Sequence, residues 1–282
     1  MNKVSTMDAY SRRLMRVVQT LWQDPLRVYT TEQLAAVAHF SPYHFHRIYR
    51  EMMGETVVAT QQRLRLHYAS RDLAQIDLPL IRVAQRAGYQ SSAAFVRSFA
   101  ATHGVTPGVY RRQRLSHLQS QINQELAMYH IEFRTLSAPI HLAARRHLGP
   151  YLNIGEAFSL LQLVESTLPV LPDARWLGLY HDDPQTVAPE QLRSDACVEI
   201  AAEGDLPADL QRLQIPAGRY AVIEHRGPYS ELEPAYHWLF GVWLPASGEQ
   251  ALAVPTIESY LNDPCITAPK DLRTEIWLAL AD

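Results

Sequence analysis

The sequence predicts a multi-domain protein, in which an all-α domain with two helix-turn-helix units precedes an α+β domain of two pseudo-symmetric β-α-β-β repeats. Three observations lead to this prediction. A helical motif that begins at Ser41 recurs from Ser91, and a Gly-Pro-Tyr motif that begins at Gly149 recurs from Gly227. The charge changes sign between the two halves. At 282 residues, the chain is long enough for two domains.

The first copy of the helical motif spans residues 41–54. Ser41 is a favoured N-cap, Pro42 occupies the first helical position, and Gly54 is suited to a left-handed C-cap. Apolar residues recur at the spacing of one buried helix face, at Phe45, Ile48, Tyr49 and Met52. The opposite face carries basic and aromatic side chains, Tyr43, His46, Arg47 and Arg50.

The second copy spans residues 91–104. Its N-cap, aromatic anchor, outward arginine and final glycine match the first copy, at Ser91, Phe95, Arg97 and Gly104. Before each copy lies a shorter helical segment with two small residues and then a tight turn. A short helix, a turn and a second helix with a basic outer face form the helix-turn-helix unit. The chain is therefore expected to carry two such units.

The remaining helices follow from periodicity and from proline positions. We expect a first helix over residues 8–23, a long helix over 57–76 between the two units, and a last helix over 110–126. The expected boundaries are a domain over residues 1–118, a linker over 119–128 and a second domain over 129–282.

Charge separates the two halves. Residues 1–127 hold 16 Arg and Lys against 8 Asp and Glu, a balance of +8, and residues 128–282 hold 10 against 21, a balance of −11. A basic half beside an acidic one is typical of a nucleic-acid-binding domain joined to a domain with another role. The sequence has no signal-peptide core and no apolar run long enough to span a bilayer, so we expect a cytoplasmic protein without a membrane partner.

The second half is also duplicated. His147-Leu148-Gly149-Pro150-Tyr151 recurs as His225-Arg226-Gly227-Pro228-Tyr229, and the segments 178–184 and 192–195 recur as 258–264 and 272–275. Each half is expected to contain a strand, a Gly-Pro turn into a helix, a strand, an Asp-Pro loop and a strand. Two such halves would pair about a pseudo-twofold axis, with a helix over each sheet and a crevice between them.

These motifs resemble known families. Residues 10–114 resemble the tandem helix-turn-helix domain of AraC/XylS-type transcription regulators, most specifically in residues 81–111. Residues 129–282 resemble the gyrase-inhibitor-like effector-binding domain, through Gly-Pro-Tyr, Glu-x-Tyr-x-x-Asp-Pro and the last strand. The order of the two domains resembles the Rob-type subgroup. The resemblance implies an activator that binds double-stranded DNA, a small-molecule effector and RNA polymerase.

The resemblance also implies which side chains contact DNA. From the first recognition helix these are Tyr43, His46 and Arg47, with Arg50 on the same face. From the second they are Ser92, Ala93, Val96 and Arg97. Arginine contacts guanine through two hydrogen bonds, although a solvated surface arginine is the alternative. Since the second helix offers Ala and Val where long polar side chains often stand, methyl contacts or DNA shape could determine recognition there.

Two strand acids, Glu258 and Glu275, are candidates for an effector site. The resemblance places acids of these strands inside a cavity with aromatic walls. The candidate walls are Tyr260, Trp277, Tyr229, Trp238 and Trp176. A carboxylate among aromatic rings favours a cationic, aromatic ligand. The spacing does not decide which acid lies deeper, and an acid on the solvated strand face is the alternative.

Other chemistry is less well supported by the sequence. His39, His44 and His46 lack a carboxylate or cysteine at ligand spacing, so we expect no metal and no cofactor. No nucleophile–His–acid set is present, which argues against an enzyme. The alternative is a toxin-hydrolysing domain of the gyrase-inhibitor-like kind, in which a glutamate and a tyrosine activate water.

Overall fold

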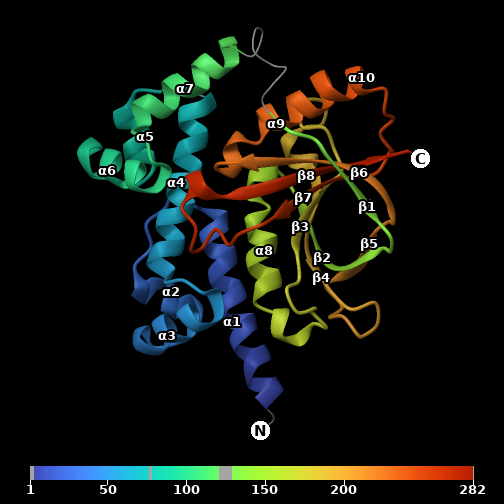
Figure 1. Cartoon of the computed structure of the whole chain (residues 1–282). Coiled ribbons are helices and arrows are strands. Elements are labelled where there is room, and N and C mark those ends of the chain that lie inside the picture. Colours follow the sequence, from blue (N-terminus) through green and yellow to red (C-terminus); the bar gives the residue numbers. More distant parts are fainter. Residues whose placement is uncertain (1–2, 76–77, 121–128, 282) are drawn as a thin grey trace. The chain divides into compact units, whose positions relative to one another are not determined.

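The computed structural model describes residues 3–75, 78–120 and 129–281. The chain divides into two compact units, residues 1–125 with 264–271, and residues 126–263 with 272–282. The first unit is helical and the second contains one sheet with helices, so the predicted fold class is confirmed (Figure 1). None of the described helices is long and apolar enough to cross a membrane.

The helical unit contains the two predicted helix-turn-helix pairs. Its helices are α1 (Lys3–Gln23), α2 (Thr31–Val37), α3 (Pro42–Met53), α4 (Val57–Gln75), α5 (Leu80–Arg86), α6 (Ser92–His103) and α7 (Pro107–Ser120). Helices α2 and α3 form the first pair, and α5 and α6 form the second. The helix α4 connects them, as expected from residues 57–76. The end of the last expected helix and most of the expected linker fall on residues 121–128, outside the described residues.

Local capping explains where the helices of the first pair begin and end. The Thr30 side chain accepts from the Gln33 backbone N–H at 3.2 Å, and the Gln33 side chain accepts from the Thr30 backbone N–H at 2.9 Å. This reciprocal capping box satisfies two of the donors that a helix N-terminus leaves without a partner. The turn to α3 contains His39, which has a φ of 52°.

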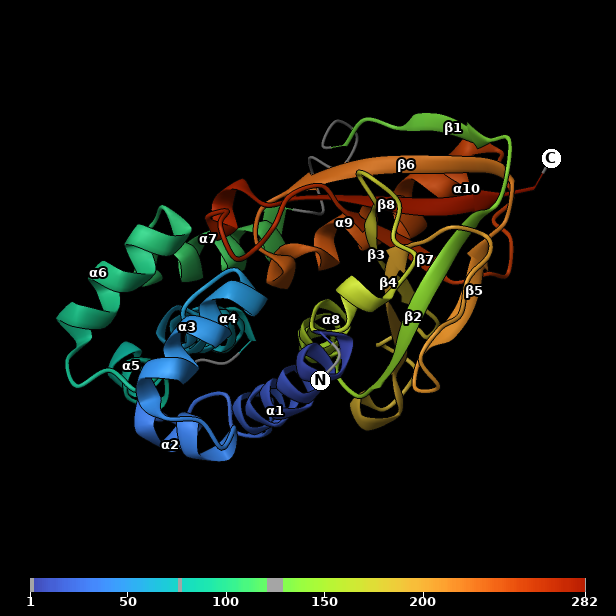
Figure 2. The ribbon, with the colours of Figure 1, turned by 90° about the horizontal axis from the view of Figure 1, so that it is seen from below.

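The second unit contains one antiparallel sheet of eight strands. Its strands are β1 (Glu132–Leu136), β2 (Ile140–Leu148), β3 (Trp176–Tyr180), β4 (Arg193–Glu199), β5 (Gln211–Ile215), β6 (Gly218–Arg226), β7 (Thr256–Tyr260) and β8 (Arg273–Leu280). They lie in the order β1-β6-β8-β7-β3-β4-β2-β5. The sheet curls, so the strands of its two ends run in different directions (Figure 2).

The predicted repeats are present, and each begins with one more strand than the sequence suggested. β1 precedes the first β-α-β-β half and β5 precedes the second, and each pairs with a strand of the other half, β1 with β6 and β5 with β2. At the centre of the sheet, β3 pairs with β7. The two halves therefore form one continuous sheet rather than two sheets.

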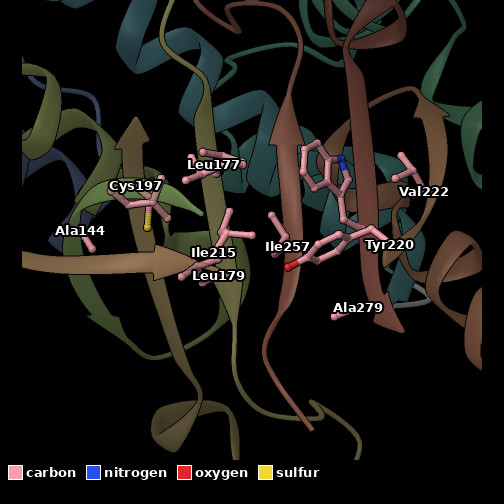
Figure 3. Close-up of a cluster of buried hydrophobic side chains, with 12 residues drawn as sticks. Ala144, Leu177, Leu179, Cys197, Ile215, Tyr220, Val222, Ile257 and Ala279 are labelled. Carbon is pink, nitrogen blue, oxygen red and sulfur yellow. The ribbon is translucent and has the colours of Figure 1, made fainter. Parts of the chain in front are cut away.

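Helices cover one face of this sheet. Leu161 of α8 (Gly155–Gln162) packs on β2 and β4. The helix α9 (Glu233–His237), the π-helical segment η5 (Trp238–Trp243) and α10 (Leu244–Ser247) follow one another in the second half. Residues from α9 and η5 pack on β6 and β8. The other face holds an apolar cluster that crosses the whole sheet, from Ala144 and Cys197 to Tyr220 and Ala279 (Figure 3).

Candidate functional site

Helix α3 presents one fixed face to solvent. The Ser41 side chain accepts from the His44 backbone N–H, and Gly54 ends the helix with a φ of 72°. The apolar side chains buried beneath the helix are Phe45, Tyr49 and Met53, whereas the expected Ile48 and Met52 are half-buried. The four side chains predicted to face DNA are all exposed, Tyr43, His46, Arg47 and Arg50. The sequence-based face assignment therefore agrees with the structure for the exposed face, whereas on the inner face Ile48 and Met52 are only half-buried and Met53 is buried instead.

Helix α6 repeats this arrangement. The Ser91 side chain accepts from the Ala94 backbone N–H at 3.2 Å, and Gly104 has a φ of 77°. Phe95, Phe99 and His103 are buried beneath the helix. Of the residues predicted to face DNA, Ala93 and Arg97 are exposed, and Ser92 and Val96 are half-buried. Each helix-turn-helix pair therefore displays an arginine at the same position of its second helix.

The candidate effector site is built around Glu258, which lies on the helix-covered face of the sheet. Glu258 of β7 pairs with Gly178 of β3 at the centre of the sheet, and its exposed fraction is 4%. Two phenols donate to its carboxylate, Tyr236 at 2.7 Å and Tyr260 at 2.9 Å. The Tyr180 hydroxyl lies 2.7 Å from the Tyr260 hydroxyl. A carboxylate at the pseudo-twofold axis is thus enclosed by tyrosines of both halves.

The electrostatics of this site are dominated by burial. Burial raises the pKa of Glu258, because desolvation disfavours the charged form, while the hydrogen bonds from the phenols act in the opposite direction. Burial, together with the nearby Glu258 charge, also raises the pKa values of Tyr180, Tyr236 and Tyr260. The phenols therefore remain protonated donors, and a cation in the site would stabilise the Glu258 carboxylate.

Aromatic rings surround the carboxylate and its tyrosines. Tyr260 makes edge-to-face contacts with Tyr229 and Phe158, each with ring centroids 5.3 Å apart. Phe158 also contacts Trp176, at 6.2 Å. The structure therefore brings four predicted residues together, Glu258, Tyr260, Tyr229 and Trp176. Trp238 packs against Tyr129 at 5.5 Å, in the apolar cluster under α9 and η5.

Glu275 and Trp277 lie on the other face of the sheet. Glu275 pairs with Ser259, and Glu258 pairs with Ile276, so the two acids point in opposite directions. The Glu275 carboxylate accepts two hydrogen bonds from Arg134, at 2.9 and 3.1 Å, and one from the Trp277 indole at 2.9 Å. The expectation that Glu275 and Trp277 share a cavity with Glu258 and Tyr260 is therefore wrong, and Glu258 is the deeper acid.

Sequence reasoning missed three residues of the Glu258 site, Tyr180, Tyr236 and Phe158. The internal repeat contained the signal for them. Tyr180 and Tyr260 occupy equivalent positions of the two copies, and so do Phe158 and Tyr236. The same alignment places Gly178 at the position of Glu258, so only one of the two equivalent positions carries a charge.

Gly178 leaves the space that the tyrosines occupy. A Cβ at this position would lie 2.7 Å from Tyr180 Cε2 and 2.8 Å from the Tyr260 hydroxyl oxygen. We therefore expect Gly178→Ala to displace both rings and to destabilise this domain by about 1–3 kcal/mol, the usual cost of overpacking. Denaturant unfolding of the full chain would measure it. Gly241→Ala is the control, because its Cβ would meet the His237 ring at 3.6 Å, and equal stability of the two variants would contradict the expectation.

Comparison with known families follows the same division of the chain. Residues 130–281 match the model of the GyrI-like small molecule binding domain, and residues 34–113 match that of a helix-turn-helix domain. The first match covers more than half of the chain. The chain belongs to the GyrI-like family. Its helix-turn-helix domain is of the AraC type, and this combination is that of a DNA-binding transcription regulator.

Several known proteins are similar to one of the two domains. The RCS-specific transcriptional activator RclR of Escherichia coli is 35% identical over 101 residues, which are 36% of each chain, so the match spans about a third of RclR. The probable transcriptional regulator YgiV of Escherichia coli is 30% identical over 149 residues, 51% of this chain and 91% of YgiV. A DNA gyrase inhibitor of Yersinia enterocolitica is 35% identical over 130 residues, 44% of this chain and 82% of the inhibitor.

One solved structure is similar along most of the chain. The cryo-EM structure of an EcmrR–DNA complex in EcmrR-RPo has a TM-score of 0.50 and 19% sequence identity. The match covers 91% of this chain and 86% of EcmrR. At 19% identity this similarity shows a shared fold only. It agrees with a helix-turn-helix domain followed by a GyrI-like domain along the chain.

Proposed function

We propose that this protein is a transcriptional activator that reads two successive major-groove segments of double-stranded DNA with α3 and α6. We further propose that its GyrI-like domain binds a small cationic and aromatic effector at Glu258. The observation that carries the first part is the repeated exposed arginine, Arg47 and Arg97. The observation that carries the second is the buried carboxylate of Glu258, which tyrosines enclose.

The arrangement of α3 and α6 supports DNA reading by both helices. Each is the second helix of its pair, the helix that enters the major groove in helix-turn-helix proteins. Each buries two aromatic side chains and exposes an arginine from the same position. Since one polypeptide carries both helices, two groove segments about one helical turn apart could be read without a dimer. Residues 1–127 also carry a net charge of +8, which favours binding to the phosphate backbone.

The surroundings of Glu258 support a cationic ligand. An ionised carboxylate in a buried, ring-lined site is stabilised by a positive partner, and the faces of Tyr and Trp rings attract cations as well. Tyr236 and Tyr260 donate hydrogen bonds to the two oxygens of the Glu258 carboxylate. A ligand that contacts the carboxylate would therefore replace hydrogen bonds that these phenols make. An apolar, aromatic body would pack against the rings of Tyr229, Phe158 and Trp176.

We propose binding rather than turnover at this site. Glu258 contacts phenols, which are weak acids with pKa values raised by burial, and this arrangement holds a charge rather than activating a nucleophile. Recovery of an intact ligand after incubation with the protein would support binding, and conversion of the ligand would contradict it. As an activator, the protein would contact RNA polymerase in the cytoplasm, and the EcmrR-RPo assembly is the basis for this partner.

Substitution of the two arginines tests the DNA-reading part of the proposal. An operator is first selected from a random DNA pool with the full chain. Arg47→Ala is expected to weaken binding by roughly 1–3 kcal/mol and to relax the preference at one base pair, because a bidentate arginine–guanine contact is lost. Arg97→Ala is expected to act in the same way about ten base pairs away. Affinity for operators with single base-pair changes is the measurement.

Arg273→Ala is the matched control for the loss of one positive charge. Arg273 lies in the GyrI-like domain, where it forms an exposed ion pair with Glu224 at 2.7 Å. Its substitution should leave base preference unchanged. If Arg47→Ala and Arg97→Ala both keep the affinity and selectivity of the control, α3 and α6 are not the reading helices.

A further inference from the structure

The two recognition helices differ in how they hold their arginines. On α3, the Arg47 guanidinium donates to the Tyr43 hydroxyl oxygen at 3.0 Å, and its carbon lies 5.8 Å from the centre of the Tyr43 ring. The Tyr43 ring in turn contacts the His44 ring at 5.7 Å, and His44 Nδ1 lies 3.1 Å from the Ser41 hydroxyl. A chain of contacts thus leads from the N-cap of α3 to Arg47.

Helix α6 has no equivalent of this chain. The repeat places Ala93 at the position of Tyr43 and Ala94 at the position of His44. Neither alanine side chain can accept a hydrogen bond or offer a ring to a guanidinium. Within the described residues, Arg97 makes no hydrogen bond and no ion pair. The same arginine is therefore held on one helix and unrestrained on the other.

We infer that Tyr43 is a positioning residue for Arg47, and that the half-site under α3 is consequently read with greater base selectivity than the half-site under α6. The inference rests on α3 and α6 being the DNA-reading helices. Arginine loses side-chain entropy when it is fixed in one rotamer, and a contact that fixes it beforehand reduces this loss on binding. Tyr43 accepts from one of the five guanidinium N–H groups, so four remain for a guanine or a phosphate.

Selectivity depends on orientation as well as on entropy. Bidentate recognition of guanine requires the guanidinium plane to meet O6 and N7 together, and a guanidinium held by Tyr43 has fewer wrong orientations. An unrestrained Arg97 can also bind a phosphate, which provides affinity without base preference. The same residue type is thus expected to specify its base more strictly from α3 than from α6.

Three variants of the full chain test this inference on the selected operator. Tyr43→Phe keeps the ring and removes the hydrogen-bond acceptor, Tyr43→Ala makes α3 resemble α6, and Ala93→Tyr introduces the missing partner one helical turn before Arg97. The measurement is the ratio of dissociation constants for operators with and without a change at one base pair. Tyr43→Phe is expected to lower this ratio by about 2- to 12-fold at the base pair under Arg47, and Tyr43→Ala by at least as much. Ala93→Tyr is expected to raise it under Arg97.

A double-mutant cycle separates positioning from direct contact. If Tyr43 acts through Arg47, Tyr43→Phe will have no further effect in the Arg47→Ala variant. An equal loss in both backgrounds would mean that Tyr43 contacts DNA itself, and the inference would be overturned. An unchanged ratio in Tyr43→Phe would overturn it as well. If Arg47→Ala and Arg97→Ala themselves have no effect, the proposed DNA-reading function fails, and the inference fails with it. If these two variants have their expected effects and only the Tyr43 results differ, the inference alone fails.

Discussion

Glu258→Gln is expected to weaken the binding of a cationic aromatic ligand by about 2–5 kcal/mol, with little effect on a neutral ligand of the same shape. The amide keeps the volume of the carboxylate and removes its charge. The loss arises because the ligand charge would then be buried without an opposite partner. Calorimetric titration of the full chain with a matched cationic and neutral dye pair is the measurement.

Glu275→Gln is the control for this experiment. Glu275 lies on the opposite face of the sheet, where it pairs with Arg134, so neither dye should respond to its substitution. Equal losses of both dyes in Glu258→Gln would mean that packing determines affinity. No loss of either dye would place the ligand elsewhere. A response to Glu275→Gln alone would reverse the assignment of the two acids.

The affinity for the cationic dye should also decrease as the pH falls. Burial raises the pKa of Glu258, so protons and the cation compete for the carboxylate as the pH falls toward that raised pKa. The affinity of the neutral dye should change little over the same range. In Glu258→Gln, the difference between the two dyes should disappear.

The helix-turn-helix domain is expected to lose about 3 kcal/mol of stability between pH 6.5 and pH 4 through a single residue, His103. His103 is 7% exposed, and its ring stacks on Phe99 with centroids 4.0 Å apart. Burial, aided by the charge of nearby His67, lowers the pKa of His103 from 6.5 to about 4. The unfolded chain therefore takes up a proton at a higher pH than the folded chain. The contribution of neutral His103 to the stability of the domain is fully present above pH 6.5 and decreases as the pH falls toward 4.

His103→Met isolates this contribution. Met53 occupies the equivalent position of the first repeat, where it is buried, so methionine is compatible with this site in the fold. Denaturant unfolding, followed through the helical signal at several pH values, would measure the stability of both proteins. As the pH falls from 6.5 to 4, the wild-type chain should lose stability relative to the His103→Met variant, because only the wild-type chain must protonate a buried imidazole. Parallel stability curves would show that His103 does not cause the loss.

The sequence by itself determined the elements whose patterns are local. Helix periodicity is a property of a few consecutive turns, so the buried and exposed faces of α3 and α6 could be predicted from the spacing of Phe45, Arg47, Phe95 and Arg97. The misassignment of Met52 concerned the end of the stripe, where two adjacent residues are both apolar. Repetition then identified both domains, because each motif was present twice, 50 residues apart in the first domain and 78 to 80 residues apart in the second.

Strand alternation predicted which residues of one strand share a face, and no more than that. Glu258 and Tyr260 are separated by a single residue and share one face, as Glu275 and Trp277 share another. Whether the two pairs meet depends on the register between β7 and β8, which places Glu258 opposite Ile276. Register is a contact between segments distant in sequence, and a shift by one residue would exchange the faces of a strand. Only the tertiary structure could therefore separate the two acids and bring Tyr180, Tyr236 and Tyr260 to Glu258.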